Sequence, residues 1–189
     1  MTKWFVVGIS GVTGSGKTTL ATSLNKTIDN SIVLNQDDYF FDKKDKRHTL
    51  ISELNHVNYD IISSMDMEKM YNDIIKIIKC NNDDDDKTTR VLILDGFLLF
   101  DCQKIADICN LKYFLILDKD ECIKRREKRV YDPPDVPGYF DIAVWPGYIN
   151  YKRKIQDNKY LNNLINYIDG TTNKDTIYQQ VHQSIINKI

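Results

Sequence analysis

Eight consecutive residues near the start of the chain constrain its fold more than any other feature. They fit the pattern G-x-x-x-x-G-K-[ST], in which small residues let backbone N–H groups close around phosphate oxygens. The segment is Gly11-Val12-Thr13-Gly14-Ser15-Gly16-Lys17-Thr18. An apolar, β-branched run precedes it at 4–9, and Leu20 and Leu24 share a helical face after it. A random chain of this length would contain the pattern about once in a hundred cases or fewer. The sequence therefore predicts a phosphate-binding loop between a strand and a helix.

The pattern also predicts what the individual loop residues do. The helix expected over 17–27 begins at the loop, and its N-terminal dipole attracts anions. Lys17 is expected to reach the β- and γ-phosphates of a nucleotide, and the Thr18 hydroxyl to bind Mg²⁺. The predicted phosphate-binding set is Gly11, Val12, Thr13, Gly14, Ser15, Gly16, Lys17, Thr18 and Thr19.

Strand-like and helix-like segments alternate along the rest of the chain. Apolar runs predict strands at 31–35, 91–94, 113–117 and 164–168. Helices are predicted at about 65–79, 119–129, 141–154 and 176–189, the first opened by Ser63 and Asp66 in capping-box spacing. The polar stretches 42–60 and 81–87 predict irregular loops, the second a solvated one with four successive aspartates, Asp83 to Asp86. The alternation favours an α/β fold, with a five-stranded parallel sheet and helices on both faces, in one domain over 1–189.

Composition excludes several classes of protein. The 189 residues contain 26 basic and 27 acidic side chains, and the net charge of −1 gives no reason to expect nucleic acid or an anionic membrane as a partner. Apolar stretches are too short to span a bilayer, and the N-terminus lacks a signal-peptide layout. Four cysteines without C-x-x-C spacing and three scattered histidines predict no zinc site. We expect a cytoplasmic protein, with the nucleus as an alternative, and no obligate protein partner.

Carboxylates follow two of the predicted strands. Asp37 and Asp38 come after 31–35, and Asp95 comes after 91–94. In open parallel sheets the ligand crevice lies beyond the carboxyl ends of the strands. If the chain transfers a phosphoryl group to a hydroxyl, that hydroxyl needs a base in this crevice to take its proton. Mg²⁺ bound to the nucleotide needs carboxylate ligands, directly or through water. The alternative, which applies most to Asp38, is that such an aspartate only caps the following turn.

A basic segment is the next candidate for phosphate chemistry. It contains Lys124, Arg125, Arg126, Lys128 and Arg129. On one helix, Arg125 and Arg129 would share a face and Arg126 would point about 100° away. The phosphate loop favours a lid that closes over the transferred group, although a solvated helix face or an RNA-binding patch remains open.

Switch GTPases contain the same phosphate loop, so this class is considered as an alternative. Asp135-Val136-Pro137-Gly138 matches D-x-x-G but lies among prolines, not after a strand. The guanine-reading pattern N-K-x-D is missing, since Asn173-Lys174-Asp175 lacks the spacer. The sequence therefore disfavours a GTPase.

Taken in order along the chain, these stretches resemble the nicotinamide riboside kinase family. The similarity covers 8–18, 36–38, 59–60, 67–70, 96–100, 129–135, 137–141, 144–146 and 169–171. The stretch 129–145 is its most specific part, because uridine kinases share the phosphate loop and the general plan but not that segment. The resemblance implies a P-loop nucleoside or nucleotide kinase-like fold with a helical lid at about 119–141. It also implies ATP- and Mg²⁺-dependent phosphorylation of the ribose 5′-hydroxyl of nicotinamide riboside, and of nicotinic acid riboside, for NAD synthesis.

The resemblance assigns roles residue by residue. Asp37 matches the catalytic base, Thr18 and Asp37 match the magnesium ligands, and Lys17 and Asp95 complete the catalytic set. Asp60 and Arg126 match residues that hold the ribose, and Tyr59 and Tyr131 match an aromatic pair around the cationic pyridine ring. Asp37 and Asp132 join this substrate-binding set. Lid contacts to ATP are implied for Arg125, Arg129, Val130 and Tyr131, and contacts to the adenine edge for Thr172, Asn173 and Lys174.

One position departs from the family pattern. The family carries glutamate where this chain has Asp95, which keeps the charge but is one methylene shorter. Direct contact with metal or substrate and contact through water both remain open. The stretches 81–87 and 159–163 match poorly and receive no role. Two alternatives remain, a uridine-type nucleoside kinase and an interaction protein that retains the fold, although intact Lys17, Thr18 and Asp37 argue against the second.

Overall fold

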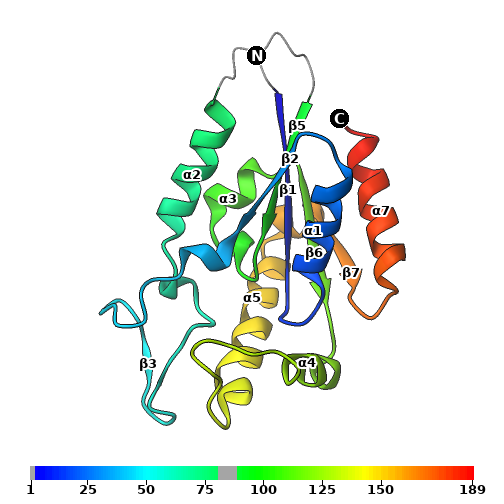
Figure 1. Cartoon of the computed structure of the whole chain (residues 1–189). Helices are drawn as coiled ribbons and strands as arrows, with labels where there is room; N and C mark the ends of the chain where they lie inside the picture. Colours follow the sequence, from blue (N-terminus) through cyan, green and yellow to red (C-terminus); the bar gives the residue numbers. More distant parts are fainter. Residues whose placement is uncertain (1–2, 81–88) are drawn as a thin grey trace.

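The computed structural model describes residues 3–80 and 89–189, so the predicted loop over 81–87, with Asp83 to Asp86, lies outside the described residues. Within these ranges the main sheet has five strands, all parallel, in the order β2-β5-β1-β6-β7 (Figure 1). This confirms the predicted five-stranded parallel sheet. The strands are β1 (Lys3–Gly11), β2 (Ser31–Asn35), β5 (Thr89–Asp95), β6 (Leu111–Ile116) and β7 (Ile165–Asp169).

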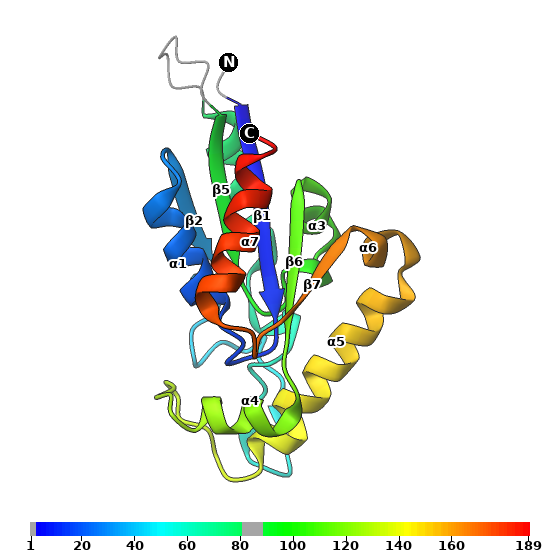
Figure 2. The same cartoon turned by 90° about the vertical axis from the view of Figure 1, so that its right-hand side faces the viewer.

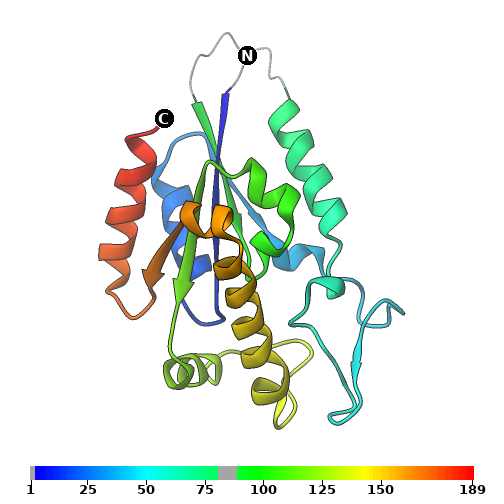
Figure 3. The same ribbon diagram turned by 180° about the vertical axis from the view of Figure 1, so that it is seen from behind.

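Both faces of the sheet are covered, because successive side chains of a strand point to opposite sides. Val7 and Ile9 of β1 pack on one face, against α1 (Lys17–Thr27) and α7 (Lys174–Ile186), which lie side by side in Figure 2. Val6 packs on the other face, in a core that also contains residues of five further helices of the described chain, seen from behind in Figure 3. These helices are α2 (Met67–Lys79), α3 (Gln103–Ile108), α4 (Lys119–Arg126), α5 (Trp145–Asp157) and α6 (Lys159–Leu164).

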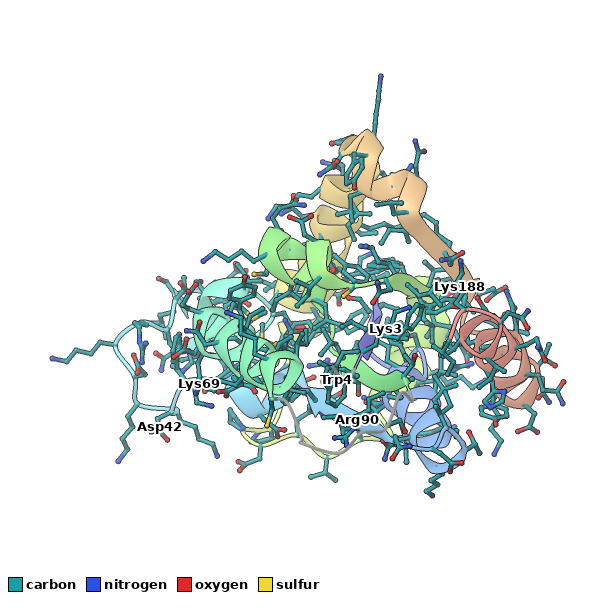
Figure 4. The ribbon with its side chains drawn as sticks, turned by 90° about the horizontal axis from the view of Figure 1, so that it is seen from above. Lys3, Trp4, Asp42, Lys69, Arg90 and Lys188 are labelled. Atoms are coloured by element: carbon teal, nitrogen blue, oxygen red, sulfur yellow. The ribbon has the colours of Figure 1, made fainter. Side chains whose placement is uncertain are left out.

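The carboxyl ends of the strands point to one end of the molecule, at the bottom of Figure 1. The phosphate loop, α4 (Lys119–Arg126) and the short hairpin of β3 (Leu50–Ile51) with β4 (His56–Val57) gather there. Figure 4 looks down on the opposite end, where the Arg90 guanidinium lies 5.9 Å from the centre of the Trp4 ring. The chemistry predicted at strand ends therefore lies at the lower end, away from Trp4 and Arg90.

The lid helix is shorter than the sequence predicted. It begins after Asp118, whose side chain accepts from the Glu121 backbone N–H at 2.8 Å, and it ends at Arg126, not at residue 129. The chain then runs without regular structure until residue 139, in a stretch with three prolines that cannot continue a helix. The prediction that Arg125 and Arg129 share a helical face is therefore wrong, since Arg129 lies beyond the helix.

Other boundaries also differ from the prediction. Asp66 is the N-cap of α2 and accepts from Lys69 N at 2.9 Å, whereas Ser63 lies in the preceding 3-10 turn (Ile62–Ser64), so the Ser63 capping box is wrong. The helix expected near 141 begins as a π-helical turn (Phe140–Val144) and continues as α5. The hairpin within 42–60 and the six-residue helices α3 and α6 were not predicted. In the described ranges, no helix combines the length and apolarity needed to cross a membrane.

Candidate active site

The phosphate loop joins β1 to α1 and leaves open space beside its backbone. Gly11 needs to be glycine, because its φ is +132° and an added Cβ would lie 2.1 Å from the Leu115 carbonyl oxygen. Gly16, the residue before α1, has φ +98°, and among the described atoms nothing lies within 4 Å of a Cβ built on it. Backbone N–H groups at a helix N-terminus with free space beside them form a cradle that fits phosphate.

Lys17 crosses this cradle. Its Nζ donates to the Val12 carbonyl oxygen at 2.8 Å. Burial lowers the pKa of Lys17 to about 8, although nearby Asp95 and Asp37 oppose the shift. A bound polyphosphate would supply the counter-charge that keeps this lysine protonated.

Asp95 and Asp37 lie at the ends of neighbouring strands, as predicted. Asp95 is only 2% exposed, and its Oδ1 has no hydrogen-bond partner among the described residues. Burial raises the pKa of Asp95, while the Thr18 hydroxyl and Lys17 lower it. Desolvation likewise raises the pKa of Asp37, which remains open to the cleft, and Lys17 lowers it. The turn that carries Asp37 is capped by Asn35, whose Oδ1 accepts from Asp37 N at 3.1 Å.

Two cavities flank the phosphate loop, and of the described residues Arg129 alone lines both. The first cavity, of about 470 Å³, is bounded by the loop, the ends of β2 and β5, and the segment after α4. Ten residues with predicted roles beyond the loop backbone line it: Lys17, Thr18, Asp37, Tyr59, Asp60, Asp95, Arg126, Arg129, Tyr131 and Asp132. So do Gly11, Val12 and Thr13.

The second cavity, of about 680 Å³, lies on the α1 and α7 side of the loop. Its predicted members are Gly14, Ser15, Gly16, Thr19, Arg125, Arg129, Thr172 and Lys174. Asn173 caps α7, its side chain accepting from Asp175 N at 2.8 Å. Val130 is fully exposed and, among the described residues, is absent from both linings. The residues predicted to bind only the acceptor thus line the first cavity, whereas the predicted nucleotide residues divide between the two cavities, with Val130 and Asn173 outside them.

Arg126 is held from two sides. Its Nε and Nη2 donate to the two carboxylate oxygens of Asp135 at 2.6 and 2.9 Å, and its Nη1 donates to Thr13 Oγ1 at 3.2 Å. The side chain is 9% exposed, and the guanidinium carbon lies 4.2 Å from the centre of the Tyr131 ring. Arg126 therefore covers one face of Tyr131, which lines the first cavity.

Asp60 and Tyr59 are fixed by Tyr139. The Tyr139 hydroxyl accepts from Tyr59 N at 2.8 Å and donates to Asp60 Oδ2 at 2.9 Å. Burial raises the pKa of Asp60, and Arg126 and this hydrogen bond lower it. The Tyr59 ring meets Phe40, His48 and His56 edge-on, with centroids 5.2–6.0 Å apart.

Two further contacts shape the first cavity. Asp132, a predicted substrate residue, forms an exposed ion pair with Lys43. Gln36 is fully buried and was not predicted to have a role. Its Oε1 accepts from Leu98 N at 2.9 Å, which ties the end of β2 to the segment after β5. The sequence shows Gln36 directly before Asp37 and Asp38, but it does not show that Gln36 contacts Leu98 across the sheet.

The strand order, the phosphate loop with Lys17 and Thr18, and carboxylates facing them across a cleft define a P-loop kinase. A family model described as an AAA domain matches residues 7–146, and a gluconokinase from Sinorhizobium meliloti 1021 shares the fold, with a TM-score of 0.60 at 11% identity over 99% of this chain and 94% of its own. Human nicotinamide riboside kinase 1 is 37% identical over 99% of this chain and 94% of its own length, and mouse nicotinamide riboside kinase 2 is 34% identical over 97% and 96%. The chain belongs to the nicotinamide riboside kinase family, which confirms the resemblance found in the sequence.

Proposed function

We propose that this chain transfers the γ-phosphoryl group of ATP to the ribose 5′-hydroxyl of nicotinamide riboside, giving the mononucleotide used for NAD synthesis. The observation that carries the proposal is the composition of the first cavity. It gathers a base candidate, ribose-binding candidates and aromatic side chains opposite Lys17. Relatives that match almost the whole chain carry the corresponding name. Nicotinic acid riboside has the same ribose and is proposed as a second acceptor.

ATP would occupy the second cavity, with its triphosphate along the loop toward the first. Arg125 and Arg129 would contact the phosphates from the lid, residues 119–141, and Thr172 to Lys174 would border the adenine. Thr18, Asp37 and Asp95 offer the hard oxygen ligands that Mg²⁺ prefers, and the unpartnered buried oxygen of Asp95 supports this fit. When bound, Mg²⁺ would neutralise charge on the β- and γ-phosphates.

The chain's own residues account for the transfer step. Asp37 takes the proton of the 5′-hydroxyl, the resulting oxygen attacks the γ-phosphorus, and the bond to the bridging β–γ oxygen breaks to leave ADP. Burial raises the pKa of the Asp37 carboxylate, whereas a Mg²⁺ ion held beside it would lower that pKa. Lys17 and Arg129 supply positive charge where the phosphoryl group passes between the cavities.

The charges around the first cavity support a cationic acceptor. In the described chain its lining includes six aspartates and four lysines or arginines. The pyridine ring of nicotinamide riboside is positively charged, whereas the bases of uridine and cytidine are neutral. The surplus of carboxylates and the aromatic ring of Tyr131 in the cavity lining therefore favour the pyridine riboside.

A substrate panel tests the proposal. Purified protein with ATP and Mg²⁺ is assayed for ADP release with nicotinamide riboside, nicotinic acid riboside, uridine and cytidine. We expect the highest kcat/KM for the two pyridine ribosides. A preference for uridine would reject the assignment in favour of a uridine-type kinase. Absence of turnover with every acceptor, in protein that still binds ATP, would favour an interaction protein.

A further inference from the structure

Residues 135–139 carry the D-x-x-G match that does not fit a GTPase, and no ligand contact has been assigned to them. We name them the brace segment. Its two ends contact the two side chains that are proposed to hold the ribose, Arg126 and Asp60. Asp60 lies on a loop 79 residues before Tyr139, and Arg126 is the last residue of α4, nine residues before Asp135.

Asp135 controls the plane of the Arg126 guanidinium. A two-pronged pair between carboxylate and guanidinium fixes both distance and orientation. Arginine has five N–H donors, and in the described structure Asp135 and Thr13 take three of them. One N–H on each terminal nitrogen therefore remains for a ligand in the first cavity. Without Asp135, the buried guanidinium would lose its counter-ion and its fixed orientation.

Tyr139 controls Asp60 in a similar way. Its ring is 2% exposed, and a turn in which Tyr139 N donates to Val136 O at 3.0 Å directs it inward. The hydroxyl donates to Asp60 Oδ2, so the carboxylate keeps its other oxygen for a ribose hydroxyl. The same hydroxyl accepts from Tyr59 N, which links the ribose contact to the aromatic residue beside it.

We infer, on the basis of the function proposed above, that the brace segment is the positioning element of the acceptor site: Asp135 orients Arg126, and Tyr139 orients Asp60. Neither residue touches the reacting atoms. Both act through side chains that bind the ribose, so their loss weakens acceptor binding and leaves nucleotide binding intact.

The neighbouring arginine provides a matched control. Arg125 donates from Nε to Glu121 Oε1 at 2.6 Å, and from Nη1 to the Gly14 and Gly170 carbonyl oxygens at 3.2 and 2.9 Å. It lines the second cavity, whereas Arg126 lines the first. Two adjacent arginines on one helix are thus each held by their own carboxylate and serve different cavities.

Steady-state kinetics of Asp135→Asn, Asp135→Glu and Glu121→Gln test the inference. Asp135→Asn should raise the KM for the riboside about tenfold or more, because it weakens hydrogen bonds to a charged group, and should leave the KM for ATP unchanged. Asp135→Glu restores the charge and should recover part of the loss. Glu121→Gln should raise the KM for ATP and leave the riboside KM unchanged. Equal increases in both KM values for Asp135→Asn would overturn the inference.

Tyr139→Phe makes the test independent of Asp135. It removes one oxygen and should also raise the KM for the riboside without raising the KM for ATP. Thermal melting checks that the variant is folded. If Asp135→Asn does not fold, a Tyr139→Phe protein that folds with an unchanged riboside KM overturns the inference. The ribose is common to all ribonucleosides, so the KM comparison is made with whichever acceptor the wild type prefers. A wild type that prefers uridine would reject the proposed substrate and still allow the brace segment to be tested.

Discussion

At the scale of single residues, Lys17 combines two opposing demands. It must be charged to bind a triphosphate, yet burial lowers its pKa to about 8 in the ligand-free protein. A lysine is cationic below its pKa, so ATP should bind tightly below pH 8 and more weakly above it, by up to about tenfold per pH unit. Titration calorimetry of a non-hydrolysable ATP analogue at pH 7–9.5 would measure this.

The same experiment has an internal control. Binding near pH 8 should take up protons, because the bound phosphates restore the charge on Lys17. Measured enthalpies should therefore depend on the ionisation enthalpy of the buffer. ATP affinity that stays constant from pH 7 to 9.5, without proton uptake, would contradict the proposed role of Lys17.

Asp37 and Asp38 are adjacent but have different predicted roles. Asp37→Asn keeps the shape of the side chain and removes the proton acceptor, so kcat should fall by at least about a hundredfold, on the order of 3 kcal/mol. Asp38→Asn is the matched control, since the turn is capped by Asn35. A large loss in Asp38→Asn with a mild effect in Asp37→Asn would show that the roles are reversed.

The buried Asp95 carboxylate is expected to destabilise the folded protein at neutral pH. Burial raises its pKa, so its favourable contribution to folding is fully present below the pKa of an unfolded aspartate, about 3.9, and is lost as pH rises through its folded pKa. Asp95→Asn should therefore raise Tm at pH 7 by a few degrees, and by less at pH 4. It should also weaken the dependence of the rate on Mg²⁺. A lower Tm at pH 7 together with an unchanged Mg²⁺ titration would remove Asp95 from the proposed metal site.

At the scale of elements, the segment after α4 ties the acceptor cavity to the phosphate loop. The Tyr131 hydroxyl lies 3.1 Å from Thr13 Oγ1, and Arg126 covers one face of the Tyr131 ring. A cationic acceptor ring can use only the opposite face. The proposed function gives Tyr131 two roles, in the lid and in contact with the ligand, and comparing substrates would separate them.

Tyr131→Leu keeps apolar bulk but removes the aromatic face. The kcat/KM for nicotinamide riboside should fall about threefold to thirtyfold, and any activity on neutral uridine should fall less. Tyr131→Phe keeps the ring and loses only the contact with Thr13, so it should retain the substrate ratio. Equal losses on both substrates in Tyr131→Leu would reject the cation–π contribution.

At the scale of the whole molecule, the two cavities share only Arg129 among the described residues. We therefore expect ADP and riboside each to bind without the other. Either ligand alone, at about one hundred times its Kd, should stabilise the protein by about 2.7 kcal/mol. Thermal melting would detect this as a rise in Tm. A riboside shift that appears only when ADP is present would show that the acceptor cavity forms after nucleotide binding.

The succession of strands and long helices along the chain could be predicted from the sequence because each has a local pattern, whereas the order of the strands in the sheet was not predicted. The sequence pattern of the phosphate loop is equally local, and it predicted the strand before the loop and the helix after it. The helices α3 and α6 were missed since six residues hold too few turns for a periodic pattern. The lid helix was drawn too long because its charged residues continue past Arg126, while its end depends on the prolines that follow.

The partners within the site were less predictable. Asp135 and Tyr139 were visible as residues, but their contacts with Arg126 and Asp60 depend on how distant segments pack together. Nothing in the local sequence indicates that one hydroxyl serves both Tyr59 and Asp60, or that Gln36 reaches Leu98. The resemblance to the family allowed roles to be proposed for residues before the structure was known. The side chains that orient those residues could be identified only in the structure.

Strand order has a consequence for how such a protein diversifies. β1 lies in the middle of the sheet, with β2 and β5 on one side and β6 and β7 on the other. Two loops that border the first cavity follow β2 and β5, and a third segment follows β6 and α4, whereas Gly170 and Thr172 of the second cavity follow β7. Insertions or substitutions in residues 40–60 can therefore change which alcohol is accepted while the nucleotide half stays as it is.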